Sequence, residues 1–225
     1  MLGRTLFEDR RDAGRQLAAR LEHYRGEEVT IVGLPRGGVE VAFEVSRSLG
    51  APLDVIVAGK VGAPMQPELA IGAVAPPGIL LLDEDLIDQL GLTDDEVELA
   101  VSRTRKEVER RIREYRGGEE LPDLQGRTCI LVDDGLATGA TTRAAIEAAR
   151  LAGAEKVVVA VPVCAPGAAE EIAQLVDELV CLAVPDRLVA IGTWYRHFDQ
   201  TSDAQVIEML EEARDEVSPE DFSEL

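Results

Sequence analysis

Residues 130–142, Ile130-Leu-Val-Asp-Asp-Gly-Leu-Ala-Thr-Gly-Ala-Thr-Thr142, indicate the fold of this 225-residue chain. The residues from Cys129 to Val132 are all apolar, which is typical of a short strand buried in a parallel sheet. Asp133 and Asp134 follow directly, at the carboxyl end of that strand. Ligands of open α/β sheets bind at this edge, where two carboxylates can accept hydrogen bonds from neighbouring sugar hydroxyls. Taken alone, the two acids also fit a helix cap or a solvated turn.

The segment after the acids consists of small residues and hydroxyls. It reads Ala137-Thr-Gly-Ala-Thr-Thr142 and leads into an apolar, helix-like stretch at residues 144–151. This pattern predicts a helix N-terminus, whose free N–H groups and positive dipole end favour a phosphate. The segment has neither the Gly-Lys-Ser/Thr of a Walker loop nor a Gly-x-Gly-x-x-Gly pattern. The acids and the loop together predict a site for a phosphorylated sugar.

This stretch resembles the 5-phosphoribosyl-1-pyrophosphate (PRPP) binding motif of type I phosphoribosyltransferases, in which four apolar residues precede two acids and a Thr-Gly-x-Thr loop. The resemblance implies that Asp133 and Asp134 hold the ribose 2′ and 3′ hydroxyls and are the catalytic residues. It implies that the 5′-phosphate binds to Ala137, Thr138, Gly139, Ala140, Thr141 and Thr142. It also implies Mg²⁺ as the cofactor, carried on substrate oxygens, with Asp133 and Asp134 as the candidate protein ligands.

A second strand-end segment, Gly33-Leu-Pro-Arg-Gly-Gly-Val39, follows a strand predicted at residues 29–33. Gly37 and Gly38 free the backbone to turn sharply, and Arg36 adds a cation with a planar fork of donors. Glycines after a strand are common, so the segment alone also fits an ordinary turn. In the resembling enzymes this loop contacts pyrophosphate, so the resemblance assigns that contact to Arg36, Gly37 and Gly38.

Lys60 stands in a third strand-end loop, after a strand predicted at residues 53–58. It is one of three lysines, with Lys106 and Lys156, among 23 basic residues. The resemblance implies a second pyrophosphate contact at Lys60, whereas a solvated surface lysine is the alternative.

The rest of the chain alternates predicted strands and helices. Helices are predicted at 12–24, 39–49, 166–175 and 202–214, and further strands at 156–163 and 179–184. This rhythm predicts an α/β fold with a doubly wound, mainly parallel sheet and flanking helices, as in type I phosphoribosyltransferases. Residues 66–75 and 79–83 are predicted to form a hairpin, and the resemblance implies that it takes the place of the family's active-site flap. A long charged helix is inserted at residues 93–116 and packs one narrow face on the core or on a second subunit.

Aromatic residues, only 4% of the chain, gather past Pro185 at Trp194, Tyr195 and Phe198. An aromatic cluster that fills a small core is one interpretation. The resemblance implies instead a small C-terminal hood that holds the base by stacking. This hood does not match those of the hypoxanthine, orotate, uracil or adenine enzymes, so the acceptor base stays open. More narrowly, residues 33–39 and 67–74 resemble a group of phosphoribosyltransferase-domain proteins.

Length and a hydrophobic content of 46% fit one sizeable core. We expect a single phosphoribosyltransferase domain over residues 1–225, with its core at about 9–184, flap and inserted helix at about 62–120, and hood at about 185–215. The sequence has no run of 18 apolar residues and no hydrophobic signal core, so we expect a cytoplasmic protein without a membrane partner. The three cysteines lie in apolar runs and are expected to be buried thiols, and the tail at 216–225 is acidic.

The net charge of −20 argues against a nucleic-acid partner, because binding to a phosphate backbone needs clustered basic residues. Low lysine with high acid content resembles the proteins of halophilic archaea. Salt screens the repulsion within such an acidic surface, so the composition predicts a stability that rises with salt.

We therefore expect a Mg²⁺-dependent phosphoribosyltransferase, in the form of a homodimer, that transfers a 5-phosphoribosyl group between PRPP and a small nitrogenous base and releases pyrophosphate. The alternative is a non-catalytic regulator on the same fold that senses PRPP or a nucleotide. A hydrolase is disfavoured because the adjacent acids at 133 and 134 do not have the spacing of an Asp-x-Asp nucleophile motif.

Overall fold

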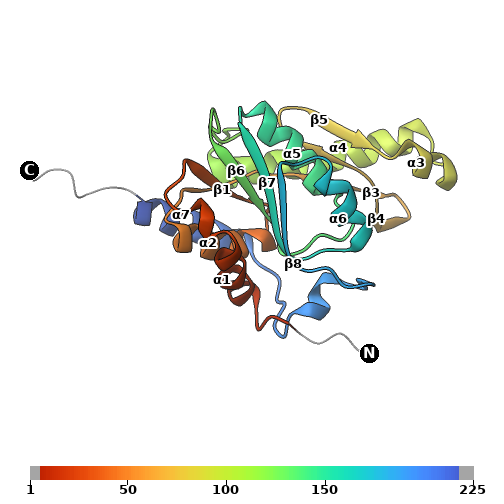
Figure 1. Cartoon of the computed structure of the whole chain (residues 1–225). Coiled ribbons are helices and arrows are strands. Elements are labelled where there is room, and N and C mark those ends of the chain that lie inside the picture. Colours follow the sequence, from red (N-terminus) through yellow and green to blue (C-terminus); the bar gives the residue numbers. More distant parts are fainter. Residues whose placement is uncertain (1–5, 218–225) are drawn as a thin grey trace, which may run out of the picture.

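The central sheet has five parallel strands in the computed structural model, which describes residues 6–217 (Figure 1). The strands lie in the order β2 (Leu53–Val55), β1 (Val29–Gly33), β6 (Thr128–Val132), β7 (Lys156–Val163) and β8 (Glu178–Ala183). From β1 the chain proceeds to β2 on one side, and from β6 it proceeds to β7 and β8 on the other. The strand order therefore reverses between β1 and β6, and this topological switch point is where ligands of such sheets bind. The predicted doubly wound α/β fold is confirmed.

Helices cover both faces of this sheet (Figure 1). The helices α1 (Arg10–Arg20), α2 (Gly37–Leu49) and α7 (Asp203–Val217) pack on one face, and α5 (Ala140–Leu151) and α6 (Pro166–Ala173) pack on the other. Successive strand residues point to opposite faces, so Ile31 joins the α1–α2 side of the core and Val32 joins the α5 side. Both faces of β1 are therefore buried, as its uninterrupted apolar run requires.

A second, antiparallel sheet contains β3 (Gly59–Ala63), β4 (Gln66–Ala75) and β5 (Ile79–Leu82). The predicted hairpin is confirmed as β4 and β5, while β3 was not predicted. This sheet packs between α5 and the long helix α4 (Asp94–Arg116), and the short helix α3 (Glu84–Leu90) follows β5. The predicted inserted helix is confirmed as α4, whose buried stripe includes Val97, Val101, Val108 and Ile112.

Three predictions near the strand ends were wrong. The strand at 53–58 ends at Val55, and Lys60 lies within β3 instead of in a strand-end loop. Gly37 and Gly38 begin α2, so part of the segment predicted as a loop forms the first helical turn, whereas the helix N-terminus predicted within residues 137–142 is confirmed by the start of α5 at Ala140. Helix α1 begins at Arg10 because the Asp9 carboxylate accepts the Asp12 N–H at 2.7 Å and caps the helix there. Two short 3₁₀ helices, η1 (Glu22–Tyr24) and η2 (Ile191–Trp194), complete the described elements.

Cys129 and Cys164 are buried and Cys181 is half-buried, and all three are free thiols. Within residues 6–217, no helix combines the length and the apolarity that crossing a membrane requires. Most of the predicted acidic tail, residues 218–225, lies outside the described residues.

Candidate functional site

The end of β6 and the start of α2 meet at the switch point. A Cβ atom at Gly37 would overlap Oδ2 of Asp134, and one at Gly38 would lie 2.8 Å from the Cα of Asp133. Only glycine permits so close an approach, because any side chain would collide with the acids. The structure therefore brings together the predicted ribose acids and the predicted pyrophosphate glycines.

Each of the two acids has one carboxylate oxygen engaged by the protein. Oδ1 of Asp133 accepts the Asp134 N–H at 2.8 Å, and Oδ2 of Asp134 accepts Nε–H of Arg10 at 2.8 Å. Among residues 6–217, no other residue donates a hydrogen bond to Oδ2 of Asp133 or Oδ1 of Asp134. The pair thus offers two acceptor oxygens, one from each acid.

Burial raises the pKa of both acids. At Asp133 the adjacent charge of Asp134 raises the pKa further, whereas at Asp134 the Arg10 guanidinium opposes the increase. The two neighbouring carboxylates therefore differ in their electrostatic environment, because within the described residues only Asp134 forms an ion pair with a cation.

Arg10, the partner of Asp134, was missed in the sequence. Its side chain is only 8% exposed, although it stands in the first turn of a helix. Its Nη1 donates to the carbonyl of Asp199 at 2.6 Å, and its guanidinium lies 3.9 Å from the ring centroid of Phe198. It also lies 3.9 Å from a carboxylate oxygen of Glu40 in α2. An arginine early in a polar helix usually lies in solvent, and no local pattern marked this one as buried.

In the described part of the chain, neither helix that begins at the switch point has a side-chain cap. Arg36 precedes α2 and Gly139 precedes α5, and neither donates or accepts a capping hydrogen bond through a side chain. Gly139 has φ +74°, in the left-handed region that favours glycine. The first N–H groups of each helix have no acceptor within the helix, so they are available to an anion.

The predicted phosphate-loop threonines differ in exposure. Thr138 is exposed and Thr141 is half-exposed, whereas Thr142 is buried at 2% exposure. Ala137 is exposed and Ala140 is buried in the first turn of α5. Thr138 and Thr141 are thus the two that can present a hydroxyl to a bound phosphate.

The two predicted basic contacts form ion pairs with acids other than Asp133 and Asp134. Nη1 of Arg36 is 3.9 Å from a carboxylate oxygen of Asp203 in α7. Nζ of Lys60 lies 3.1 Å from a carboxylate oxygen of Glu68 and 3.2 Å from its carbonyl, within the second sheet. In the described structure, therefore, Lys60 is bonded to the flap and not to the strand-end segments.

The predicted hood residues pack against the N-terminal segment. The Tyr195 hydroxyl donates to the carbonyl of Asp134 at 2.6 Å, and its ring lies 5.3 Å from that of Phe7 and 4.9 Å from that of Phe198. Tyr195 is buried, Trp194 is half-buried and Phe198 is 36% exposed. Burial, followed by the nearby charge of Asp134, raises the pKa of Tyr195. Tyr195 thus has the position that core packing predicts, and it links the hood to the acids.

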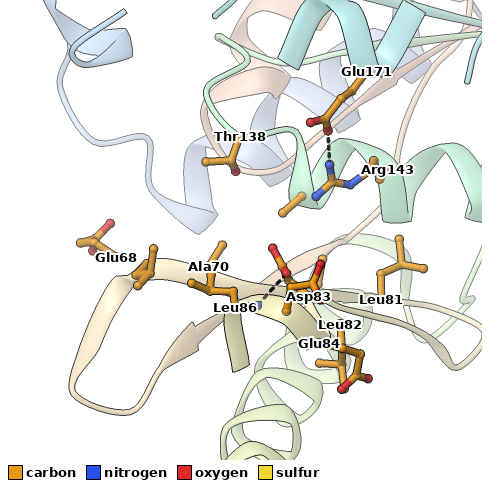
Figure 2. A pocket seen from close by; sticks show the side chains of 15 residues that line it. Glu68, Ala70, Leu81, Leu82, Asp83, Glu84, Leu86, Thr138, Arg143 and Glu171 are labelled. Carbon is orange, nitrogen blue, oxygen red and sulfur yellow. Dashed lines mark hydrogen bonds and ion pairs between the residues drawn. The ribbon is translucent and has the colours of Figure 1, made fainter. Parts of the chain in front are cut away.

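A cavity of about 760 Å³ lies between the phosphate loop and the flap hairpin (Figure 2). Thr138 and Arg143 line it from the α5 side, and Glu68, Ala70 and Asp83 line it from the hairpin side. Nη1 of Arg143 donates to a carboxylate oxygen of Glu171 at 2.5 Å. The volume is in the range of small-molecule sites, and the cavity shares Thr138 with the predicted phosphate loop.

The sequence of this chain matches the phosphoribosyl transferase domain family over residues 8–193. The chain belongs to the phosphoribosyltransferase family. Two Mycobacterium tuberculosis proteins, from strains CDC 1551 and H37Rv and each named "Putative phosphoribosyl transferase", are 47% identical to it over 208 residues. That alignment covers 92% of this chain but 47% of each relative, so the chain spans about half the length of the curated relatives it matches.

Solved structures agree with the fold. The crystal structure of the TT1426 protein from Thermus thermophilus is 41% identical, with a TM-score of 0.75 over 92% of this chain and 98% of that chain. The AQ2163 protein from Aquifex aeolicus is 16% identical, with a TM-score of 0.50 over 81% of this chain and 78% of that chain, and it shows the shared fold alone.

The acids of this phosphoribosyltransferase fold suit Mg²⁺. Among residues 6–217, no three histidine, cysteine or acidic side chains gather into a preformed metal site. Mg²⁺ prefers oxygen ligands and is usually held by one or two carboxylates together with substrate phosphates and water. Two adjacent carboxylates with one open oxygen each fit that pattern of binding.

Proposed function

We propose that this phosphoribosyltransferase transfers a 5-phosphoribosyl group from PRPP to a nitrogen atom of a small base and releases pyrophosphate, with Mg²⁺ as cofactor. The observation that carries the proposal is the pair of open carboxylate oxygens on Asp133 and Asp134, set between two helix N-termini that lack side-chain caps within the described residues. Carboxylates accept hydrogen bonds from sugar hydroxyls, and uncapped helix starts attract phosphates. One ligand with a phosphate, a diol and a pyrophosphate satisfies all three features.

In this arrangement the start of α5 binds the 5′-phosphate. Its free N–H groups and the hydroxyls of Thr138 and Thr141 donate to the anion, and Gly139 lets the chain turn into the helix. The start of α2, with Gly37 and Gly38, receives the pyrophosphate, and Arg36 supplies a nearby cation. Lys60 reaches the pyrophosphate only after it leaves Glu68, so its contribution depends on a shift of the flap.

The chemical step breaks the bond between C1 of the ribose and a pyrophosphate oxygen and forms a bond between C1 and the acceptor nitrogen, whose proton passes to solvent or to the leaving pyrophosphate. Positive charge develops on the sugar ring, and the half-buried carboxylates of Asp133 and Asp134 stabilise it from close range. Mg²⁺, held by these carboxylates and by substrate oxygens, would neutralise charge on the leaving pyrophosphate. The β4–β5 hairpin lines the cavity, and its closure over the substrate would limit the access of water to C1.

The cavity beside the phosphate loop narrows the choice of acceptor. The residues that line it include four carboxylates on its hairpin side, which are Glu68, Asp83, Glu84 and Asp85. Arg143, the only cation in the lining among residues 6–217, is paired with Glu171. Such a lining repels an anionic base and attracts N–H donors or a positive charge. We therefore propose a neutral or cationic nitrogenous acceptor in place of a carboxylated one.

The test is PRPP binding by calorimetry, with and without Mg²⁺, on the wild type and on the Asp133→Asn/Asp134→Asn double variant. We expect Mg²⁺-dependent binding that the double variant loses while its fold, followed by circular dichroism, is unchanged. A screen of bases for pyrophosphate release then identifies the acceptor, with amino-substituted and carboxylated bases compared directly. PRPP binding that is equal in both proteins would exclude the acids as the ribose site.

A further inference from the structure

Arg10 connects the acid pair to the hood through a single buried guanidinium. Its Nε donates to Oδ2 of Asp134, its Nη1 donates to the Asp199 carbonyl, and its face lies against the ring of Phe198. The carboxylate of Asp134 is itself only 15% exposed. No other cation forms an ion pair with Asp134 among the residues that the structure describes.

The geometry leaves only one oxygen of Asp134 for a ligand. Arg10 occupies Oδ2, and the main chain of the same residue is held by the Tyr195 hydroxyl at its carbonyl. Rotation of the carboxylate would break the 2.8 Å bond to Arg10 inside a site with little water to replace it. Oδ1 is therefore held in one orientation before any ligand arrives.

We propose that Arg10 is a positioning residue that fixes the Asp134 carboxylate so that its Oδ1 accepts a ribose hydroxyl. This inference rests on the proposed function, because it requires the sugar to bind at the acid pair. Asp133 forms no ion pair among residues 6–217, so no protein cation neutralises its ionised carboxylate, which can then stabilise the developing positive charge on the sugar. The two adjacent acids thus have different roles. Asp134 binds the sugar in the ground state, and Asp133 acts mainly during bond cleavage.

A structural role for Arg10 is the competing explanation, since a buried arginine that ties three segments also supports the fold. The two roles differ in which ligand they affect. A positioning role weakens ligands that carry ribose hydroxyls, whereas a loosened fold weakens every ligand of the site. Ribose 5-phosphate carries the hydroxyls, whereas pyrophosphate without Mg²⁺ carries neither the hydroxyls nor a metal for Asp134.

The experiment measures the binding of ribose 5-phosphate and of pyrophosphate, both without Mg²⁺, to the full chain, for the wild type and for Arg10→Gln and Arg10→Lys. A hydrogen bond to a charged group contributes enough that we expect Arg10→Gln to bind ribose 5-phosphate about ten- to hundredfold more weakly. The binding of pyrophosphate without Mg²⁺ should change by less than about threefold, because it requires neither a ribose hydroxyl nor a metal on Asp134. Arg10→Lys returns a cation to Asp134 and should recover part of the loss. Steady-state assays should show a raised KM for PRPP with kcat little changed, as expected when ground-state binding is lost.

Arg11→Gln is the matched control, because Arg11 is the next residue of α1, is 45% exposed, and pairs with Glu44 away from the acids. It should bind both ligands as the wild type does. Equal losses of both ligands in Arg10→Gln, or no loss of ribose 5-phosphate, would overturn the positioning role. Binding that is absent in the wild type, or unchanged in Asp134→Asn, would instead contradict the proposed function itself.

Discussion

The helices at the switch point begin differently from those in the rest of the molecule. Side chains cap α1, α3 and α4, through Asp9, Asp83 and Thr93. Helices α2 and α5, which follow β1 and β6, begin without a cap from any described side chain. Helix α6 also lacks one, but its first residue is proline, which has no N–H to satisfy.

The presence or absence of a side-chain cap suggests different tasks for the two groups of helix starts: stabilising the helix or binding a ligand. A cap stabilises a helix by satisfying N–H groups that would otherwise be free, typically by about 1 kcal/mol. At α2 and α5 that stabilisation is absent, and the free groups point toward the edge where Asp133 and Asp134 lie. Substitutions of the capping residues of α1, α3 and α4 should therefore lower the free energy of unfolding and leave ligand binding unchanged. Substitutions at the starts of α2 and α5 should weaken ligand binding and change the free energy of unfolding less.

The largest expected effect is at Asp133. We expect Asp133→Asn to lower the rate of pyrophosphate release by about a hundredfold or more, because the charge that stabilises the developing cation is removed. The measurement is kcat at saturating PRPP and acceptor. A rate within a fewfold of the wild type would remove Asp133 from the chemical step.

The same variant should not lose stability, which sets it apart from an ordinary core substitution. Burial raises the pKa of Asp133, so the protonated form favours folding. The contribution of protonated Asp133 to the free energy of unfolding is complete below pH ~4 and is lost as the pH rises through the raised pKa. Asp133→Asn should therefore unfold at a higher temperature than the wild type at pH 7, and the difference should shrink toward pH ~4. A variant that is less stable at pH 7 would contradict this.

The sequence predicted the fold through its periodic elements and predicted the two anion segments through their chemistry. The hydrophobic runs of β1, β6 and β7 and the stripe of α4 follow local rules of alternation and helical spacing, so their positions were confirmed. The meeting of Gly37 with Asp134 also follows, because β1 and β6 are neighbours in a sheet of this topology.

The parts that the sequence did not predict depend on long-range contacts. Arg10 is buried only because the hood and α2 close over it, and Lys60 lies in a strand only because β4 pairs with it. Neither contact leaves a periodic signal near the residue. The burial of Tyr195 likewise depends on Phe7, far away in the chain.

The second-largest expected effect is at Gly37, the first residue of α2. Alanine normally stabilises a helix relative to glycine by about 0.5–1 kcal/mol. At Gly37 the new Cβ would overlap Oδ2 of Asp134 and lie 2.7 Å from Nε of Arg10. We expect Gly37→Ala to weaken PRPP binding about tenfold or more, measured by calorimetry.

Gly167→Ala in α6 is the matched substitution. A Cβ there meets no described atom within 4 Å, and the residue is exposed within a helix. It should raise the free energy of unfolding by about 0.5–1 kcal/mol and leave PRPP binding unchanged. Similar effects of the two variants on binding would mean that the close approach at Gly37 does not matter to the ligand.

Salt should change the stability of both groups of helices together. With a net charge of −20, the folded chain repels itself, and raising KCl from about 0.1 to about 2 M shortens the screening length from ~10 Å to a few ångströms. We expect the unfolding midpoint to rise across that range. The rise should be smaller near pH ~4.5, where fewer carboxylates are charged. A midpoint that is constant or falls with salt at pH 7 would contradict the prediction.

The smallest and most direct test compares two threonines at helix starts. Thr93 caps α4 in a capping box with Glu96, whereas the hydroxyl of Thr138 makes no hydrogen bond within residues 6–217 and precedes the uncapped α5. Thr93→Ala should cost about 1 kcal/mol, or roughly 2–4 °C in the unfolding midpoint by size scaling, and leave PRPP affinity unchanged. Thr138→Val should keep the midpoint and weaken PRPP binding about fivefold, the typical contribution of one neutral hydrogen bond. If Thr138→Val lowered the midpoint and spared the ligand, the free helix start at α5 would be a structural feature after all, and the division between capped and uncapped helices would no longer mark the site.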